Sequence, residues 1–571
     1  MPQPAPNALY YGDNLDVMRR HVDDESVDLA YLDPPFNSAA SYNVLFSTKG
    51  GGAAAAQVRA FEDTWHWDEA AAAAFRAIVD AGGHFAELFV GFRAVVSEAD
   101  MLAYLVMMCP RLAELHRVLK PTGSLYLHCD PTASHYLKLL LDAVFGPHRF
   151  RSEVAWRRSG AHSDAKQGRR NYGHIHDVLL FYTKGEAYTW NTQYTPYDEA
   201  YVARDYRLVD EDGRRFRRDN LTAAKPGGDV SYEWRVKRPA GLRVRWQADL
   251  EDEHLAPLEG WEYKGVPPYA GRFWAYSLEN MRQFARENRI RHTFDGMPEF
   301  KRFLDEMPGV PLQDLWTDIE ALHSQSAERL GYPTQKPEAL LERIIAVSSN
   351  PGDVVLDPFC GCGTAVVAAQ KLGRRWVGVD LTYLAVSLMK KRLTDTYGEA
   401  ARFRVVGEPT TLEDAVALAA SDPYQFQWWA LGLCGARPAD EKKGADKGVD
   451  GRLFFHDGPA GGVPKQIVFS VKAGNVSAAH VRDLGHVVHR DKAAIGVLIS
   501  MQDPTKPMRS EAAGAGFYES AHWGRFPRLQ LLTVAELLGG KGVQMPAPRQ
   551  TNATLRQAPR ARERDEQRSF L

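Results

Sequence analysis

Along the first 190 residues of the chain, segments with the apolar pattern of a strand alternate with segments that have the apolar pattern of a helix. Short apolar and β-branched runs bounded by turn residues predict strands, and apolar residues at three- and four-residue spacing predict helices between them. The same alternation returns between residues 337 and 394. The predicted strands are 8–11, 28–32, 123–128, 152–156, 177–182, 353–357 and 376–380, and the predicted helices are 14–22, 98–118, 133–145, 337–348, 363–372 and 383–394. Strands that alternate with helices predict a parallel α/β sheet.

Other regions depart from this rhythm. Residues 48–60 are small and glycine-rich, as expected of a mobile loop. Residues 190–330 contain many Trp, Tyr and Arg residues with little periodicity, which indicates an insertion. After residue 400 a new pattern predicts helices over 412–435 and 478–490 and strands over 452–456, 466–471 and 494–500, and the Arg-rich tail has the composition of a disordered segment. The expected domains are 1–189, 190–330, 331–400 and 401–545, followed by the tail 546–571.

Composition narrows the class of protein. With 571 residues, 44% hydrophobic and 25% charged, the chain is expected to be globular with two or three domains. It has no apolar run of about 18 residues and no signal-peptide pattern, so we expect a cytoplasmic protein without membrane contact. Five cysteines without a disulfide framework fit a reducing compartment, and Cys360 and Cys362 lack a second Cys/His pair for a metal. The net charge of −2 means that any DNA contact must come from local patches.

The stretch VVLDPFCGCGTAVV (354–367) has the pattern of a nucleotide-binding turn. A strand runs into two glycines and then into a helix, so the backbone can approach a ligand and the helix offers free N–H groups. Asp380 ends the next predicted strand, where a carboxylate can accept hydrogen bonds from ribose hydroxyls. The dehydrogenase pattern G-x-G-x-x-G is absent, so a nucleoside carrying a methionine carboxylate is a better guest than a pyrophosphate.

A second motif, Asp33-Pro34-Pro35-Phe36, follows the predicted strand 28–32. The prolines end the strand in a stiff extended exit, which would hold the acid and the ring in fixed positions.

Together these motifs resemble those of the amino-methylating DNA methyltransferases. DPFCGCGT (357–364) is similar to the family's F-x-G-x-G motif, DPPF (33–36) to its catalytic motif, and TQKPEALLERII (334–345) to its helix before the glycine loop. DPPF precedes the glycine loop here, whereas an unpermuted sheet has the reverse order. The order resembles the circularly permuted β class, in which the target-recognition region lies between the two motifs, as 190–330 does. The resemblance implies a permuted Rossmann-like α/β sheet and S-adenosylmethionine as cofactor.

The resemblance also implies roles for residues. Asp33 and the carbonyl of Pro34 would accept hydrogen bonds from the exocyclic amino group of a flipped base, Pro35 would keep them rigid, and Phe36 would stack on the base. Aspartate at the first position favours adenine N6 over cytosine N4, and the lack of a Pro-Cys pair argues against cytosine C5 chemistry. The predicted cofactor-binding residues are Asp13, Lys336, Asp357, Phe359, Gly361, Gly363, Thr364 and Asp380. His128 and Asp130 could approach the site, but a hydrogen-bonded strand-end histidine is the better interpretation.

Double-stranded DNA is the expected partner. Four segments of the insertion interleave Arg or Lys with aromatic residues, and such mixtures suit phosphates and unstacked bases. They are RRFRRDN (214–220), EWRVKRP (233–239), LRVRWQ (242–247) and YAGRFWAYS (269–277). SYNVLF (41–46) and DTWHWDE (63–69) could close over a flipped base or simply pack. A second copy of the chain, in a homodimer, is a further partner to consider.

The region after 400 resembles the Mrr-like branch of restriction endonuclease folds. In that branch an Asp after a glycine turn, and an acid or Gln two residues before a Lys, bind a divalent metal such as Mg²⁺. Asp450 and Lys472 fill two of these positions, but Ser470 stands where an acid is expected and is a weak ligand. Either the domain cleaves DNA with help from another group such as Gln427, or it only binds. The chain is thus expected to be a DNA methyltransferase, with a single-chain restriction-modification enzyme or an N4-cytosine methyltransferase as the alternatives.

Overall fold

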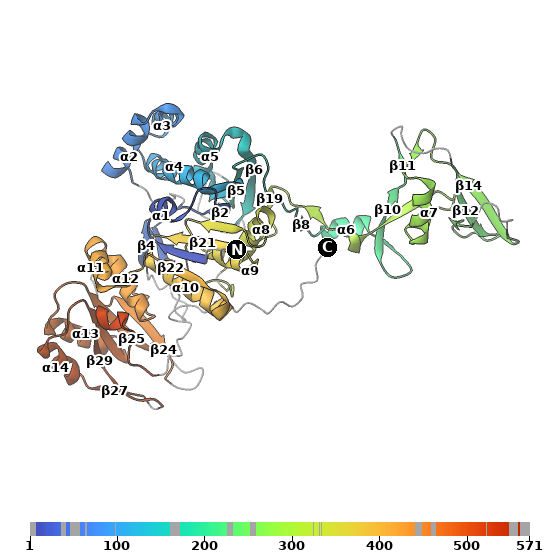
Figure 1. Ribbon diagram of the computed structural model, residues 1–571. Coiled ribbons are helices and arrows are strands. Elements are labelled where there is room, and N and C mark those ends of the chain that lie inside the picture. Colours follow the sequence, from blue (N-terminus) through green and yellow to red (C-terminus); the bar gives the residue numbers. More distant parts are fainter. Residues whose placement is uncertain are drawn as a thin grey trace, which may run out of the picture. The chain divides into compact units, whose positions relative to one another are not determined.

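The computed structural model describes most of the chain, in two compact units (Figure 1). The described residues are 7–35, 41–45, 57–62, 66–97, 99–159, 172–224, 232–251, 258–323, 325–330, 332, 334–439, 448–457, 464–520, 522–546 and 558–559, with 41–45 and 57–62 described as backbone only. The second unit is Thr192–Leu312, and the first unit contains the other described residues. No helix within these ranges is both long and apolar enough to cross a bilayer.

A nine-stranded sheet in the order β19-β6-β7-β5-β2-β20-β21-β1-β22 forms the centre of the first unit. Its strands are β1 (Asn7–Tyr11), β2 (Val27–Leu32), β5 (Leu119–Cys129), β6 (Phe150–Arg157), β7 (His176–Thr183), β19 (Leu315–Trp316), β20 (Val354–Asp357), β21 (Arg375–Asp380) and β22 (Phe403–Val406). Strand β7 runs antiparallel to both of its neighbours, and the remaining pairs are parallel. The predicted α/β sheet is confirmed. Strands β20 and β21, late in the chain, lie between β2 and β1, which is the permuted order.

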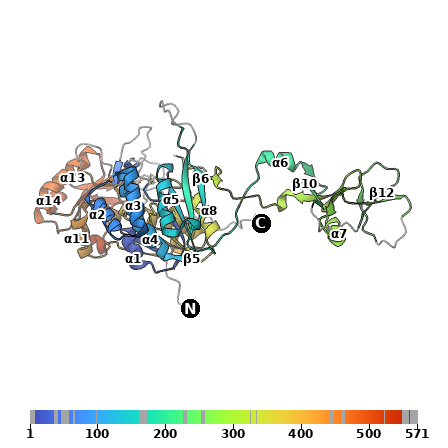
Figure 2. The same cartoon turned by 90° about the horizontal axis from the view of Figure 1, so that it is seen from above.

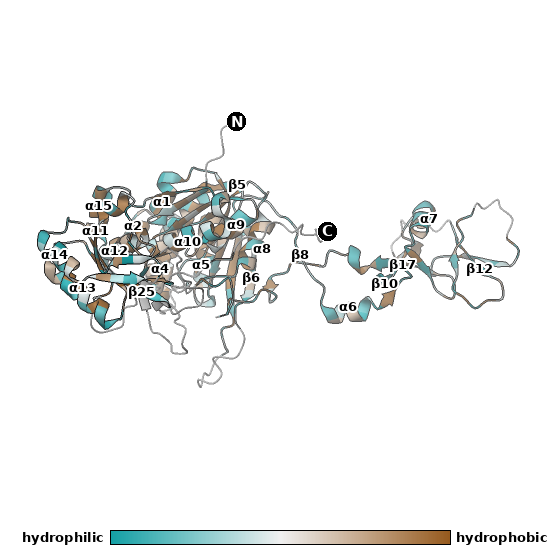
Figure 3. Cartoon of the chain, turned by 90° about the horizontal axis from the view of Figure 1, so that it is seen from below, coloured by the Kyte–Doolittle hydropathy of each residue, from teal (hydrophilic) through white to brown (hydrophobic). Residues whose placement is uncertain are grey.

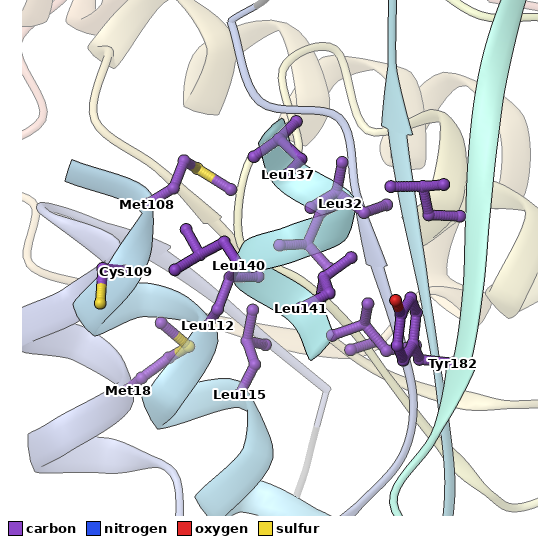
Figure 4. Close-up of a cluster of buried hydrophobic side chains, with 14 of the residues drawn as sticks. Met18, Leu32, Met108, Cys109, Leu112, Leu115, Leu137, Leu140, Leu141 and Tyr182 are labelled. Atoms are coloured by element: carbon purple, nitrogen blue, oxygen red, sulfur yellow. The ribbon is translucent and has the colours of Figure 1, made fainter. Parts of the chain in front are cut away.

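Helices cover both faces of this sheet (Figure 1). On one face lie α1 (Asn14–His21), α4 (Asp100–Val118) and α5 (Pro131–Phe145), and on the other α8 (Glu338–Ser348), α9 (Thr364–Lys371) and α10 (Tyr383–Tyr397). Because side chains alternate along a strand, Ala30 and Leu32 of β2 enter the first core and Leu29 and Tyr31 the second. Figure 4 shows the first core, where leucines of α4 and α5 pack around Leu32. A sheet buried on both faces leaves its strand ends as the place for a site.

Capping side chains begin several of these helices directly after strands. Asp13 accepts the N–H of Leu15 at the start of α1, Asp130 that of Ala133 in α5, and Thr382 that of Ala385 in α10. Caps of this kind satisfy N–H groups that the first helical turn leaves without partners. The short turns that result keep the helix N-termini at the carboxyl edge of the sheet.

Some elements of the first unit differ from the prediction. Helices α2 (Glu69–Asp80) and α3 (Gly83–Val96) were not predicted, because the alanine run of α2 carries helix propensity but no apolar periodicity. Strands β3 (Ser41–Leu45) and β4 (Gln57–Glu62) pair with each other. The expectation of a loop over 48–60 is therefore wrong for residues 57–60, and the rest of that loop lies outside the described residues.

The second unit, expected to be irregular, contains several small sheets (Figure 2). Its elements are β8 (Tyr194–Thr195), α6 (Glu199–Asp205), β9 (Leu208–Val209), β10 (Arg215–Asn220), β11 (Thr222–Ala223), β12 (Trp234–Pro239), β13 (Gln247–Ala248), β14 (Trp261–Val266), β15 (Phe273–Trp274), α7 (Leu278–Arg286), β16 (Ile290–His292), β17 (Pro298–Phe303) and β18 (Val310–Pro311). Buried Trp234, Trp246 and Trp274 form its core. The second unit spans fewer residues than the expected insertion 190–330. It ends at Leu312, and β19, which follows, pairs with β6 of the large sheet.

The C-terminal domain of the first unit has a five-stranded sheet in the order β23-β24-β25-β26-β29. Its strands are β23 (Arg437–Pro438), β24 (Gly451–Phe455), β25 (Lys465–Lys472), β26 (Ile495–Ser500) and β29 (Leu529–Thr533), with a hairpin of β27 (Phe517–Ser520) and β28 (Gly524–Pro527). Its helices are α11 (Leu412–Ser421), α12 (Pro423–Leu433), α13 (Ala478–Arg490), α14 (Lys506–Gly514) and α15 (Val534–Leu538). Figure 3 shows polar and apolar residues together on α13, whose apolar side chains are buried.

Two expectations for this part of the chain need correction. The single helix over 412–435 is wrong: Asp422 caps a new helix at Pro423, because proline lacks the N–H that a continuing helix needs. The tail from 546 was expected to be disordered, yet Ala558 is buried and its N–H donates to Asp395 at 3.2 Å. Residues 547–557 and 560–571 lie outside the described residues.

Candidate active site

Four aspartates stand at the carboxyl ends of four adjacent strands of the large sheet. The strands β2, β20, β21 and β1 are neighbours and run parallel. Asp357 and Asp380 are the last residues of β20 and β21, while Asp33 follows β2 directly and Asp13 lies two residues past the end of β1. Ligands of open α/β sheets bind at this edge, where the strand order turns. The structure therefore brings together acids that are up to 367 residues apart in the chain.

The glycine turn after β20 has a backbone that other residues would strain. Gly361 and Gly363 have φ values of +49° and +76°. A Cβ on Gly363 would lie 2.4 Å from Cγ of Met389, and one on Gly361 would lie 3.1 Å from the ring of Tyr332. Helix α9 begins at Thr364 directly after this turn, so its first N–H groups are available to an anion.

Asp380 is buried and holds the turn from the next strand. One carboxylate oxygen accepts the N–H of Gly361 at 2.9 Å, and the other accepts both the N–H and the hydroxyl of Thr382 at 2.8 Å. Burial raises the pKa of Asp380 to about 6, although these hydrogen bonds oppose the shift. A carboxylate has about four lone-pair positions, so Asp380 keeps capacity to accept from a hydroxyl group.

Asp357, Phe359 and Thr364 shape the turn itself. The carboxylate of Asp357 accepts the N–H of Phe359 at 3.1 Å, and burial raises the pKa of Asp357 well above its ordinary range. The hydroxyl of Thr364 accepts a hydrogen bond from buried Arg392 at 3.2 Å. The side chains of Asp357 and Thr364 are thus engaged within the protein.

Asp33 forms an ion pair with Lys336. The ammonium group lies 2.7 and 2.6 Å from the two carboxylate oxygens, and the side chains are only 16% and 11% exposed. Pro34 is buried and Pro35 half-buried, which fits a rigid exit from β2. The sequence predicted a cofactor contact for Lys336, whereas the structure places its ammonium on the predicted base-binding carboxylate. Phe36 lies outside the described residues.

Asp13 caps α1 and pairs with Arg111 of α4 at 2.6 Å. Arg111 also donates to the side-chain oxygen of Asn14 at 2.6 Å, and Asn14 donates to the carbonyl of Pro358 at 2.8 Å. This chain of contacts ties β1 and α4 to the glycine turn. Sequence reasoning missed Arg111 and Asn14, although a lone arginine in the apolar stretch LVMMCPRLAEL was a signal for Arg111.

Tyr332 was also missed. Burial raises its pKa well above the ordinary range, and the charges of Asp380 and Asp33 add to the shift. Its ring lies beside Gly361 in the glycine turn. The signal in the sequence was its place four residues before Lys336 in GYPTQKP.

His128 is fully buried and hydrogen-bonded at both ring nitrogens, to the hydroxyl of Tyr31 at 2.9 Å and the carboxylate of Asp177 at 3.2 Å. Asp130 caps α5. The interpretation of His128 as a satisfied core histidine is confirmed.

The predicted nuclease residues also lie together in the C-terminal domain. One oxygen of Asp450 accepts the N–H of Val471 at 2.6 Å and the hydroxyl of Ser470 at 3.2 Å, and it lies 3.6 Å from the ammonium of Lys472. Gln427 of α12 donates to the carbonyl of Asp450 at 3.5 Å. Within the described ranges, which omit 440–447, no three His, Cys, Asp or Glu residues are grouped to hold a metal ion.

The family follows from a comparison with known sequences. Residues 27–391, more than half of the chain, match the N6_N4_Mtase model, whose description is DNA methylase. The chain belongs to this family of DNA methylases. Residues 425–538 match the model of NACHT-associated inactive Restriction Endonuclease 1, so a restriction-endonuclease-like domain is present. The predicted family and both predicted folds are thereby confirmed.

Several curated relatives of this DNA methylase align over about two thirds of the chain. Type II methyltransferase M.EcaI of Enterobacter cloacae is 28% identical over 388 residues, which are 68% of this chain and 69% of the relative. DNA adenine methyltransferase YhdJ of Escherichia coli (strain K12) is 23% identical over 386 residues, 67% of this chain and 82% of the relative. The solved PvuII DNA methyltransferase (cytosine-N4-specific) covers 67% of this chain and 85% of its own, at 12% identity and a TM-score of 0.31. A TM-score this low adds nothing to the assignment.

Members of the DNA methylase family use S-adenosylmethionine, and the residues at the strand ends fit such a group. Gly361 and Gly363 let the backbone of the turn adopt positive φ, α9 offers N–H groups for a carboxylate, and Asp380 offers an acceptor for ribose hydroxyls. The cofactor roles of the individual residues remain predictions.

The basic segments of the methylase's second unit are partly neutralised. Arg214 pairs with Asp305 and Glu306, and Arg238 pairs with Glu262. Arg243 and Arg245 of LRVRWQ are exposed. The predicted DNA contact of this unit remains a prediction.

Proposed function

We propose that the chain transfers the methyl group of S-adenosylmethionine to the exocyclic N6 of adenine in double-stranded DNA. One observation carries the proposal: Asp33 and the glycine turn leave neighbouring parallel strands, β2 and β20, at the same edge of the sheet. A donor held by the turn and a base held by Asp33 are therefore neighbours. This is the arrangement that an in-line methyl transfer needs.

Asp33 binds the exocyclic amino group of the base. An exocyclic amino nitrogen is a poor nucleophile because its lone pair is delocalised into the ring. The carboxylate of Asp33 and the carbonyl of Pro34 accept hydrogen bonds from its two N–H groups and draw the nitrogen toward tetrahedral geometry. The bound S-adenosylmethionine supplies a methyl group on a sulfonium: the N–C bond forms as the S–C bond breaks. The cationic methylamino group formed in this way then passes a proton to water. Asp33 need not be a strong base, because the proton leaves after the transfer.

The stiff exit of β2 keeps the acceptors of this site in place. Proline has a locked φ, so the carbonyl of Pro34 and the carboxylate of Asp33 keep one spacing. Because a duplex hides the amino group, the base must be flipped out of the stack, and Phe36 offers a ring to stack on. Lys336 must release or share the carboxylate when the base arrives, since it lies within 2.7 Å of both oxygens.

Adenine is the preferred base for two reasons. Aspartate at the first position of the catalytic motif favours N6 of adenine in this family. A relative that aligns over 386 residues is named a DNA adenine methyltransferase. Methylation of cytosine N4 is the alternative.

The test is methyl transfer from labelled S-adenosylmethionine to unmethylated duplex DNA, followed by digestion to nucleosides and mass spectrometry. We expect label in N6-methyladenine. Label in N4-methylcytosine would overturn the choice of base, and the absence of any transfer would overturn the function.

A single-chain restriction-modification enzyme is the second candidate. The grouping of Asp450, Gln427 and Lys472 favours it, because these residue types can bind Mg²⁺ and activate water. Ser470 weakens it, since hard cations prefer carboxylate oxygens, and so does the word inactive in the description of the matching domain family. Magnesium-dependent cleavage of unmethylated DNA that Lys472→Ala abolishes would establish a nuclease. DNA that stays intact would leave methylation as the activity.

A further inference from the structure

The restriction-endonuclease-like domain packs directly on the cofactor half of the methyltransferase. Tyr383 and Leu384 of α10 share one buried cluster with Phe426 and Trp429 of α12. The two helices approach closely at Gly432, where a Cβ would lie 2.9 Å from the ring of Tyr383. Apolar burial of this kind ties the position of α12 to that of α10.

One polar contact crosses this interface. The side-chain oxygen of Gln425 in α12 accepts the N–H of Tyr383 at 3.0 Å. Tyr383 is the first residue of α10, and its N–H has no partner within the helix. Gln425 therefore acts as an additional cap of α10, supplied by the C-terminal domain.

This cap is next to the acid of the cofactor site. Thr382, the residue before Tyr383, donates both its N–H and its hydroxyl to the carboxylate of Asp380 at 2.8 Å. The same carboxylate accepts the N–H of Gly361 in the glycine turn at 2.9 Å. A continuous series of hydrogen bonds and peptide units thus runs from Gln425 to the predicted ribose-binding group.

A second contact reaches the neighbouring strand. The ring of Tyr11, at the end of β1, packs edge-on against that of Tyr383, with centroids 5.7 Å apart. Burial raises the pKa of Tyr11 to about 12, and the nearby charges of Asp422, which caps α12, and Asp380 add to the shift. Gly12 and Asp13 follow Tyr11, so α12 and α10 together support two of the four strand ends of the site.

We propose that Gln425 is a positioning residue for the methyl-donor site and that the restriction-endonuclease-like domain is thereby part of this site. The proposal rests on the proposed function, because it takes the donor to bind beside Asp380. Without the cap, the segment from Asp380 to Tyr383 has more freedom, and binding of the donor must order it again. The domain then supports methylation whether or not it cleaves DNA.

The test uses the full chain with Gln425→Met, which keeps the side-chain length and removes the acceptor. Isothermal titration calorimetry with S-adenosylmethionine, without DNA, should show affinity weakened about five-fold, the value of one hydrogen bond. KM for S-adenosylmethionine should rise by about the same factor, and kcat at saturation should stay within about two-fold. Tyr424→Met is the matched control, because Tyr424 precedes Gln425 in the same helix and is 62% exposed.

Two further results decide the case. Gln425→Glu keeps an acceptor oxygen for the N–H of Tyr383 and should retain wild-type affinity. This result would distinguish loss of the hydrogen bond from a general loss of packing. Wild-type affinity of Gln425→Met at an unchanged Tm, or a fall in kcat without a change in affinity, would overturn the proposal. A wild-type chain that neither binds S-adenosylmethionine nor transfers methyl groups would instead overturn the proposed function.

Discussion

The strand-end site of the large sheet and the Asp450 cluster of the C-terminal domain contain the same kinds of groups. Each joins a lysine to an aspartate beside buried strands. Asp33 is bound by the ammonium of Lys336, which belongs to a side chain from another part of the chain. Asp450 is bound by the N–H of Val471, which belongs to strand β25 and cannot leave without disturbing the sheet.

Residue types alone therefore do not make a site. What matters is whether a ligand can take the place of the present partners. At Asp33 the donor is a side chain, and in the proposed function the amino group of the base replaces or joins it. At Asp450 the donor nearest to the carboxylate is a backbone N–H, and Ser470 stands where a stronger ligand is expected.

The largest expected effect is that of Asp33→Ala. Loss of the acceptor should lower kcat for methyl transfer by at least about a hundred-fold, the usual cost of removing a preorganised hydrogen bond at the reacting group. Steady-state kinetics with labelled S-adenosylmethionine checks this, and calorimetry should find cofactor affinity within about two-fold of wild type. Activity equal to wild type would refute the mechanism.

Lys336→Met should have the next largest effect. Because the ammonium lies on Asp33 and both side chains are mostly buried, its loss leaves the carboxylate without a cation and lowers kcat about ten-fold. Affinity for S-adenosylmethionine should change little. A large rise in the dissociation constant with normal kcat would show that Lys336 serves the cofactor, as the sequence alone predicted.

We expect Asp380 to make binding of S-adenosylmethionine pH-dependent. Its pKa is about 6, and hydroxyl donors of a ribose favour the ionised form. Affinity should therefore be full above pH 6 and fall as the pH drops below it, by up to about ten-fold per pH unit. Titrations between pH 5 and 8 check the sign, with Asp380→Asn as the control that should bind weakly and without this dependence. Stronger binding at pH 5 than at pH 7 would contradict the assignment.

The smallest effect on methylation belongs to Asp450→Ala. The change removes an acceptor from the N–H of Val471 and should lower the free energy of unfolding by about 1 kcal/mol, visible in urea denaturation. Methyl transfer should stay within about two-fold of wild type. A hundred-fold loss of methyl transfer, like that expected for Asp33→Ala, would show that the Asp450 cluster is also needed for methylation.

Much of the fold could be predicted because its signals are local. The apolar runs around β2, β20 and β21 and the spacing of helices α8 to α10 depend on neighbouring residues, so their bounds were close to those found. Helix α2 was not predicted because a run of alanines has high helix propensity but shows no apolar face. The helix break at Pro423 was overlooked, although a proline commonly begins a new helix.

The family, the order of the permuted strands and the acids at their ends could all be predicted from the sequence. They depend on short motifs of consecutive residues. One example is the glycine turn, where Gly363 adopts a positive φ that other residues rarely tolerate. Three sets of contacts could be found only in the folded chain: the ion pair of Lys336 with Asp33, the link from Asp13 through Arg111 and Asn14 to the glycine turn, and the hydrogen bond of Gln425 with Tyr383. These contacts join residues 42 to 344 positions apart, and only the packing of the helices on the sheet brings them together.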